Sequence, residues 1–120
     1  MENSFEKLKV WQLSHKLVLE IYKLTESFPS GERFSLVDQI RRSASSVPTN
    51  IVEGNERKSK KEYIQFLYTS KGSLAETRYH LLLAKDLEYI SEEKYNSLIS
   101  NAVEISKMLS ALIKYLRSTN

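Results

Sequence analysis

Apolar residues recur at every third or fourth position over long stretches of this chain, a spacing that places them on one face of a helix. The first stretch predicts a helix from about Val10 to Ser27. The Phe28-Pro29-Ser30-Gly31 turn should end it, because proline disfavours a helical residue before it and glycine allows a positive φ. The expected core stripe of this helix is Val10, Ser14, Leu17, Ile21, Leu24 and Phe28.

The second stretch keeps its phase across a proline. Its stripe consists of Val37, Ile40, Ala44, Val47 and Ile51. A proline inside a helix removes a hydrogen bond and usually kinks the helix, so two structures compete: one helix bent at Pro48, or two helices that meet there. The unbroken phase favours the bent helix. We expect it to end near Gly54, a residue suited to a left-handed C-terminal cap.

Two serines mark the starts of the remaining helices. Ser59-Lys60-Lys61-Glu62 fits the capping-box pattern and predicts a third helix that runs to about Lys85 or Leu87. Ser91 can cap a fourth helix, whose first acidic residues complement the positive end of its dipole. The stripes of these two helices are Tyr63, Leu67, Ser70, Leu74, Thr77, Leu81 and Ala84, and then Tyr95, Leu98, Ala102, Ile105, Leu109, Leu112 and Leu116.

Four helices with short connections predict an all-α fold, an antiparallel up-and-down four-helix bundle. The 120 residues leave no room for a second core, so residues 1–120 are expected to form a single domain. The longest apolar run, Leu81 to Ala84, is too short to cross a membrane, and the first residues show no charged-then-apolar signal pattern. We therefore expect a cytoplasmic protein with no membrane partner.

Several apolar residues of the third and fourth helices lie outside these stripes. A helix that faces a core broadly needs more than two apolar positions per heptad, which could account for them. The alternative, which we favour, is that some of them are buried against another subunit in a homo-oligomer. The residues concerned are Tyr68, Tyr79, Leu82, Leu83, Ile99 and Ile113.

The residue types argue against catalysis. The chain has no cysteine, which excludes disulfides, thiolate zinc sites, iron–sulfur clusters and cysteine nucleophiles. Neither His15 nor His80 follows a glutamate at the three-residue spacing of di-metal bundles, and Glu76 with His80 provides only two ligands. Glycine-rich phosphate loops are also absent. The sequence thus predicts no enzyme, metal, cofactor or small-molecule substrate.

The charges point to one dense basic segment. The chain carries 18 lysines and arginines against 15 acidic residues, a net charge of +3. Four cations cluster at the expected connection between the second and third helices: Arg57, Lys58, Lys60 and Lys61. Such a cluster can bind nucleic-acid phosphates in a salt-dependent manner. A solvated connection whose charges promote solubility has the same composition, and composition alone favours that second interpretation.

Arg41 and Arg42 lie beside the inward-facing Ile40 and Ala44. One or both could therefore form a structural ion pair with an acidic neighbour. The candidate partners are Asp38, Glu53 and Glu56.

Polar residues also follow the internal proline. Asn50 and Glu53 are expected to satisfy the backbone carbonyl that Pro48 leaves without a partner. A structural role is thus our favoured interpretation for both.

The order of motifs resembles a known family. Leu36-x-x-Gln39-Ile40-Arg41-Arg42 is followed by Ser46-Val47-Pro48-x-Asn50-Ile51-x-Glu53-Gly54, then by Glu62-Tyr63-x-x-Phe66-Leu67 and Gly72-Ser73-x-x-Glu76. This order resembles the four-helix-bundle proteins encoded in intervening sequences of bacterial 23S ribosomal RNA genes, over nearly the whole chain. The run around Pro48, Asn50, Glu53 and Gly54 is its most specific part.

The resemblance implies a bundle that assembles into a ring, a homopentamer. The chain is also similar to the accessory variability determinant of diversity-generating retroelements, a basic pentameric bundle that works with a reverse transcriptase and nucleic acid. If a nucleic-acid role transfers, the matching positions are Arg41, Arg42, Arg57 and Lys58. We therefore expect a non-enzymatic bacterial oligomer that binds RNA or DNA phosphates through a basic face; the alternative is a protein-interaction scaffold with no nucleic-acid role.

Overall fold

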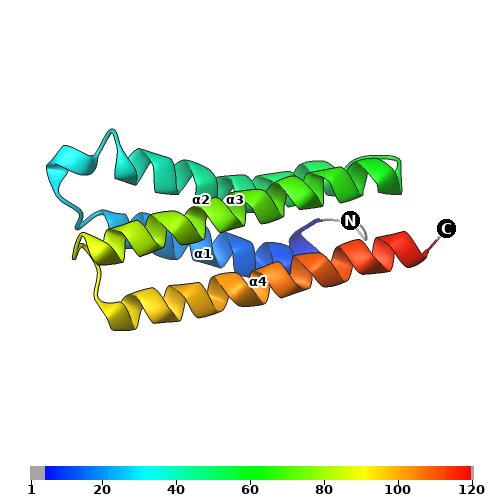
Figure 1. Cartoon of the computed structure of the whole chain (residues 1–120). Coiled ribbons are helices and arrows are strands. Elements are labelled where there is room, and N and C mark those ends of the chain that lie inside the picture. The colour runs from blue at the N-terminus through cyan, green and yellow to red at the C-terminus, as the bar shows by residue number, and fades with distance from the viewer. Residues whose placement is uncertain (1–4, 120) are drawn as a thin grey trace.

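The computed structural model describes residues 5–119, and within them it contains four long helices, two short 3-10 turns and no strand (Figure 1). The helices form an elongated bundle that measures 49 × 23 × 22 Å. No helix in residues 5–119 is long and apolar enough to cross a bilayer. The four-helix prediction is confirmed. The elements are η1 (Phe5–Lys7), α1 (Lys9–Thr25), η2 (Ser30–Glu32), α2 (Leu36–Asn55), α3 (Lys60–Asp86) and α4 (Glu92–Ser118).

Each helix packs against its two neighbours around the bundle, and α2 against α3 is the most extensive pair. The chain passes up and down, so the connections fall at two ends (Figure 1). The α2–α3 connection lies beside the start of α1 and the end of α4, and we call this the terminal end. The α1–α2 and α3–α4 connections lie at the other, the distal end.

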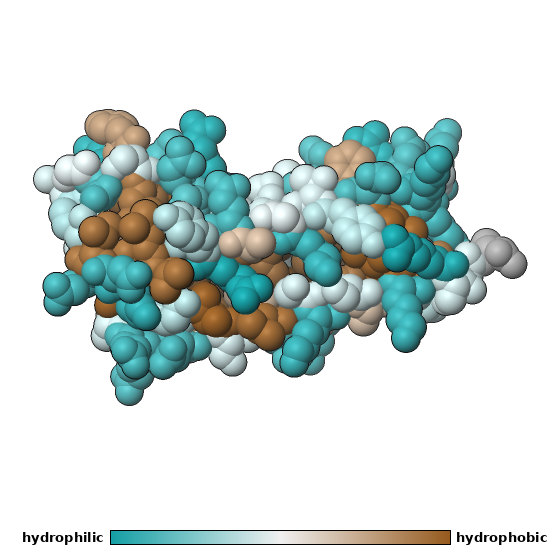
Figure 2. All heavy atoms as spheres, in the orientation of Figure 1, coloured by the Kyte–Doolittle hydropathy of each residue, from teal (hydrophilic) through white to brown (hydrophobic). Residues whose placement is uncertain are grey.

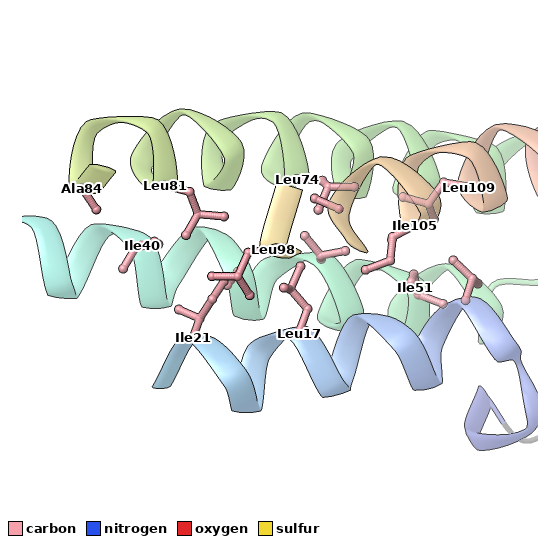
Figure 3. Close-up of a cluster of buried hydrophobic side chains, with 14 of the residues drawn as sticks. Leu17, Ile21, Ile40, Ile51, Leu74, Leu81, Ala84, Leu98, Ile105 and Leu109 are labelled. Carbon is pink, nitrogen blue, oxygen red and sulfur yellow. The ribbon is translucent and has the colours of Figure 1, made fainter. Parts of the chain in front are cut away.

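The core consists of the predicted stripes with a few changes (Figure 3). All five residues of the second stripe are buried, as are Leu98, Ile105 and Leu109 of the fourth. In α4, however, Ile113 is 3% exposed, whereas Leu112 is only half-buried. For Ile113, the broad core-facing helix is therefore the right one of the two explanations that its position outside the stripe left open. Adjacent positions flank the same face, and the rotation of α4 against its neighbours decides which one enters the core.

A similar exchange occurs near the end of α1. Leu24 is half-buried, whereas the adjacent Thr25 is 3% exposed and satisfies its hydroxyl by donating to the Ile21 carbonyl at 2.8 Å. Tyr63 and Tyr95 also pack against the core from half-buried positions. The stripes therefore fix which face of each helix points inward, but not each residue's depth.

Short hydroxyl side chains line the contact between α2 and α3. Small residues allow two helices to approach closely, and each buried hydroxyl here has a hydrogen-bond partner. The interhelical bonds join Thr77 Oγ1 to Ser43 Oγ at 2.9 Å, Ser46 Oγ to Ser73 Oγ at 2.8 Å, and Ser70 Oγ to the Val47 carbonyl at 2.8 Å.

The second helix continues through Pro48 as one element, so the two-helix alternative is wrong. Asn50 Nδ2 donates to the Ser46 carbonyl at 2.8 Å and to Ser46 Oγ at 2.9 Å. A proline frees the carbonyl four residues before it, which is that of Ala44. Asn50 therefore supports a different carbonyl from the one expected. Glu53 is exposed and forms no side-chain hydrogen bond within residues 5–119.

Gly54 lies within α2, and none of the described glycines has a positive φ, so its predicted role as a left-handed cap is wrong. Its importance is steric. A Cβ added at Gly54 would lie 2.8 Å from Tyr63 Cδ1 and 2.9 Å from Phe66 Cβ. The absence of a side chain allows α2 to approach α3 just before the connection that joins them.

The left-handed residue is instead Glu88, with a φ of 66°, after the end of α3. The Glu88 N–H donates to the Lys85 carbonyl and the Tyr89 N–H to the Ala84 carbonyl, both at 2.9 Å. This pair of bonds is a Schellman motif, whose left-handed position is usually glycine. The turn into α4 is thus closed by backbone hydrogen bonds at a residue type that gives no such signal.

Candidate nucleic-acid interface

The two ends of the bundle carry opposite charge. Within residues 5–119, the terminal end has eight cations and four carboxylates: Lys7, Lys9, Arg57, Lys58, Lys60, Lys61, Lys114 and Arg117, with Glu6, Glu53, Glu56 and Glu62. Counted to the same depth along each helix, the distal end has six cations and eight carboxylates: Lys23, Arg33, Arg41, Arg42, Lys85 and Lys94, with Glu20, Glu26, Glu32, Asp38, Asp86, Glu88, Glu92 and Glu93. A polyanion is attracted to the first end and repelled from the second.

The α2–α3 connection presents its cations to solvent. Ser59 caps α3, because its Oγ accepts from the Glu62 N–H at 3.1 Å, which confirms the predicted cap. Arg57, Lys58 and Lys61 are exposed, and none of them forms an ion pair among the described residues. Their charges are therefore not neutralised within the described chain. We call these three residues the turn cluster.

Lys60 differs from the turn cluster in its surroundings. It is half-buried, and its Nζ donates to Thr119 Oγ1 just after α4. This contact joins the start of α3 to the end of α4. Its place in the sequence groups Lys60 with its basic neighbours, but the structure gives it an interhelical contact as well.

Arg41 lies away from this surface, about 16 residues before Arg57, or roughly 24 Å along the helix. Its Nε donates to Thr25 Oγ1 at 2.9 Å and its Nη2 to the Tyr22 carbonyl at 3.1 Å. The guanidinium also lies 4.5 Å from the centre of the Tyr22 ring. Arg41 therefore holds α2 against α1, and the ion pair expected for one or both of the arginines does not involve it.

Arg42 does form the expected ion pair, from its Nε to Asp38 Oδ2 at 3.0 Å. Both side chains are well exposed, so the pair contributes little to stability. It nevertheless places a carboxylate beside Arg42. The six cations predicted to bind nucleic acid thus separate into a group at the terminal end and a pair of arginines on α2 that have other contacts.

Two cations that were not predicted as site residues join α3 to α4. Arg117 Nη2 donates to the Tyr68 hydroxyl at 2.6 Å, and Lys71 Nζ donates to Ser110 Oγ at 2.7 Å. They are isolated in the sequence and meet their partners only because the two helices are antiparallel. One sequence feature could have indicated Lys71: it shares a seven-residue spacing with Arg78 and Lys85, which places the three cations on one strip of a helix.

The histidine and acidic residues do not assemble a metal site. His80 Nε2 lies 3.3 Å from Glu76 Oε2, the i,i+4 contact that the spacing allows. Within the described chain, no group of three histidine or acidic side chains could hold a metal ion. The Glu76–His80 pair is a local hydrogen bond on α3.

The distal end is closed by a carboxylate. Ser35 Oγ donates to Glu32 Oε1 at 2.6 Å, and the Tyr89 hydroxyl donates to Glu32 Oε2 at 2.7 Å. These two hydrogen bonds lower the pKa of Glu32 below its ordinary 4.5, and the carboxylate raises the pKa of Tyr89 above its ordinary 10.0. Glu32 thereby links the α1–α2 connection to the α3–α4 connection.

This link predicts a loss of stability in acid. A carboxyl group whose pKa is lower in the folded state stabilises it above the unfolded pKa, near 4.5, and loses that contribution as pH falls through the folded pKa. Urea unfolding of the wild type and of Glu32→Gln should therefore differ most at neutral pH, and the difference should shrink below about pH 4.5. A difference that stays constant from pH 7 to pH 3 would contradict this role.

Comparison with known proteins identifies the family. The family model described as "23S rRNA-intervening sequence protein" matches residues 6–111. The chain belongs to this family. A crystal structure of a protein of unknown function from the S23 ribosomal protein family of Bacteroides thetaiotaomicron superposes on this chain with a TM-score of 0.81. The two chains are 31% identical over 88% of this one and 98% of the other.

These comparisons confirm the resemblance to the 23S rRNA-intervening sequence family and the helical bundle. No curated protein matches the chain. The role of the bundle must therefore be argued from its own surface.

Proposed function

We propose that this protein is a non-enzymatic, oligomeric bundle of the cytoplasm that binds RNA or DNA phosphates through its terminal end. The observation that carries the proposal is the turn cluster: three exposed cations that pair with no carboxylate of residues 5–119, on the basic end of a bundle whose other end is acidic. Lysine and arginine side chains displace condensed counterions from a phosphate backbone, which drives binding. The acidic end should orient the molecule so that the terminal end meets the nucleic acid.

A salt titration tests this proposal. Fluorescence anisotropy with a structured RNA and with duplex DNA should show affinity that falls steeply as salt rises. Replacing the turn cluster (Arg57→Gln, Lys58→Gln, Lys61→Gln) should weaken duplex binding at least tenfold at low salt. It should also reduce the slope of log K against log salt by about 0.9 for each phosphate that the variant no longer neutralises.

A matched variant controls for net charge. Lys16→Gln, Lys23→Gln and Lys94→Gln remove the same charge from exposed positions outside the turn cluster, so they should leave most of the affinity intact. Binding that does not depend on salt, no binding at low salt, or equal losses in both triple variants would contradict the proposal.

The oligomeric part of the proposal is supported by an exposed apolar patch at the distal end. Phe34 is 88% exposed, and Tyr79, Leu83 and Leu87 line the same hollow. Figure 2 shows apolar side chains gathered over this end of the molecule. A monomer rarely leaves such a cluster open to water, so we infer that a second copy covers it. Only Tyr79 and Leu83 of this patch were among the residues expected to contact another subunit.

Light scattering at several concentrations tests self-association. The wild type should have a mass well above 13.9 kDa, and the pentameric ring that the family resemblance implies would have about five times that mass. Phe34→Ser should shift the distribution towards the monomer, whereas Leu19→Ser, which changes an exposed leucine of α1, should not. A strict monomer would contradict self-association.

The same patch favours a second candidate function, a protein-interaction scaffold with no nucleic-acid role. In that case a helical partner protein would cover Phe34 and its neighbours, and the turn cluster would serve solubility alone. The titration separates the two candidates, because a scaffold would show no salt-dependent affinity for RNA or DNA.

A further inference from the structure

The outer seam between α3 and α4 carries a row of cations that come from two helices and lie far apart in the sequence. Three contacts fix how the helices align along it. Arg117 reaches Tyr68 near the terminal end, Lys71 reaches Ser110 next, and Lys85 Nζ lies 4.8 Å from the centre of the Tyr95 ring near the distal end. The seam therefore has a known register over nearly its whole length.

Helix geometry places three more cations on this seam. Arg78 lies seven residues from both Lys71 and Lys85, which contact α4, so all three share one strip of α3. Lys107 and Lys114 lie three residues before and four residues after Ser110, which places them beside it on α4. Lys85 lies at the acidic distal end and is left out of the following definition. We call the other five cations the basic seam: Lys71, Arg78, Lys107, Lys114 and Arg117.

The nearby carboxylates point elsewhere. The structure describes all of α3 between Tyr63 and Lys85, and the only acidic residue there is Glu76. Glu76 forms a hydrogen bond with His80, and His80 lines a hollow together with residues of α2. Between Lys94 and Ser118 the only one is Glu104, which faces α1. No member of the basic seam forms an ion pair with a described residue.

An exposed aromatic ring accompanies these cations. Tyr68 is 42% exposed on the seam and seven residues after Lys61, so the row continues into the turn cluster. Arg117 holds the Tyr68 hydroxyl, and its guanidinium lies 5.4 Å from the ring centre. A cationic track with an exposed aromatic is the arrangement that binds single strands, because unpaired bases stack on the ring while the backbone follows the charges.

We propose that the basic seam and Tyr68 bind single-stranded nucleic acid, with one base stacked on the Tyr68 ring and the phosphates along the seam cations. The proposal rests on the proposed nucleic-acid function and specifies its ligand. A duplex keeps its bases paired and stacked. Its phosphates can contact the turn cluster and the seam cations, but its bases cannot stack on the Tyr68 ring.

The test measures binding of the full chain to three fluorescently labelled ligands: a 12-mer of oligouridine, a 12-mer of oligothymidine and a 12-base-pair DNA duplex. Fluorescence anisotropy at a fixed salt concentration gives the affinity for each. Tyr68→Leu should weaken binding of both single strands at least about fivefold, the lower end of what stacking on an aromatic ring contributes per base, and should leave duplex binding unchanged. Tyr68→Phe keeps the ring and should bind like the wild type. Tyr115→Leu removes an exposed tyrosine of α4 that lies five residues after Ser110, on a face of the helix away from the seam, and should have no effect.

A second measurement addresses the seam charges. Lys107→Gln with Lys114→Gln should lower the salt slope of single-strand binding by about 0.7 for each phosphate that these lysines no longer neutralise, whereas Lys16→Gln with Lys23→Gln should leave it unchanged. Equal affinity for the two single strands would support recognition by stacking and charge, and tighter oligouridine binding would support the same site with added 2′-hydroxyl contacts.

The outcomes separate this inference from the proposed function. If Tyr68→Leu binds single strands as well as the wild type does, or loses duplex binding to the same degree, the seam proposal is overturned while salt-dependent binding through the turn cluster still stands. If neither single strands nor the duplex bind at low salt, both proposals fail.

Discussion

Replacing Gly54 by alanine is expected to lower the free energy of unfolding by about 2 kcal/mol, although alanine is ordinarily the better helix former. The new Cβ would lie 2.8 Å from Tyr63 Cδ1 and 2.9 Å from Phe66 Cβ. The Tyr63 ring can move aside, but Phe66 Cβ is fixed to the backbone of α3. The two helices must therefore separate next to the connection that joins them, where Gly54 faces Tyr63 and Phe66.

Gly72 provides the matched control. It lies exposed within α3, and a Cβ there would meet nothing within 4 Å. Gly72→Ala should therefore raise the free energy of unfolding by about 0.5–1 kcal/mol, through helix propensity and a less flexible unfolded chain. Urea unfolding followed by circular dichroism measures both variants. A stabilising Gly54→Ala would show that α2 and α3 do not approach as closely as the structure indicates.

Leu109→Ala should lower the free energy of unfolding by about 3–4 kcal/mol. Leu109 is completely buried in α4, surrounded by the packed interior, so its removal leaves a cavity that the neighbouring helices cannot close. Leu112→Ala, three residues further on, should cost only about 1–2 kcal/mol, because its half-buried side chain already meets solvent.

The comparison of these two leucines tests the rotation of α4. Both belong to the same stripe in the sequence, and only the structure separates them. The same urea experiments give the difference in unfolding free energy. Equal losses, or a larger loss for Leu112→Ala, would mean that α4 presents a different face to the core.

Helix positions were predictable because their signals are local. Three-and-four spacing, the serine caps and the Phe28-Pro29 turn each act within a few residues, and they located all four helices. The choice between Leu112 and Ile113 depends on how α4 rotates against α1 and α3, which no local pattern contains. The left-handed position is Glu88 rather than a glycine, and glutamate is a residue type that does not predict a left-handed conformation.

The candidate site was predictable only where its cations are consecutive. The turn cluster stands out in the sequence and remains exposed in the structure. Arg41 looks equally available in the sequence, but its partners, Thr25 and Tyr22, come from another helix. The basic seam was missed for the converse reason: Tyr68 and Arg117 are 49 residues apart, and antiparallel packing alone brings them together.

The central claim is that nucleic acid meets the basic terminal end and not the acidic distal end. Photocrosslinking of a 4-thiouridine-containing RNA to the full chain, followed by peptide mapping, tests it directly. We predict crosslinks in residues 57–61 and at Tyr68. Crosslinks confined to residues 26–38 and 86–93 would contradict the claim.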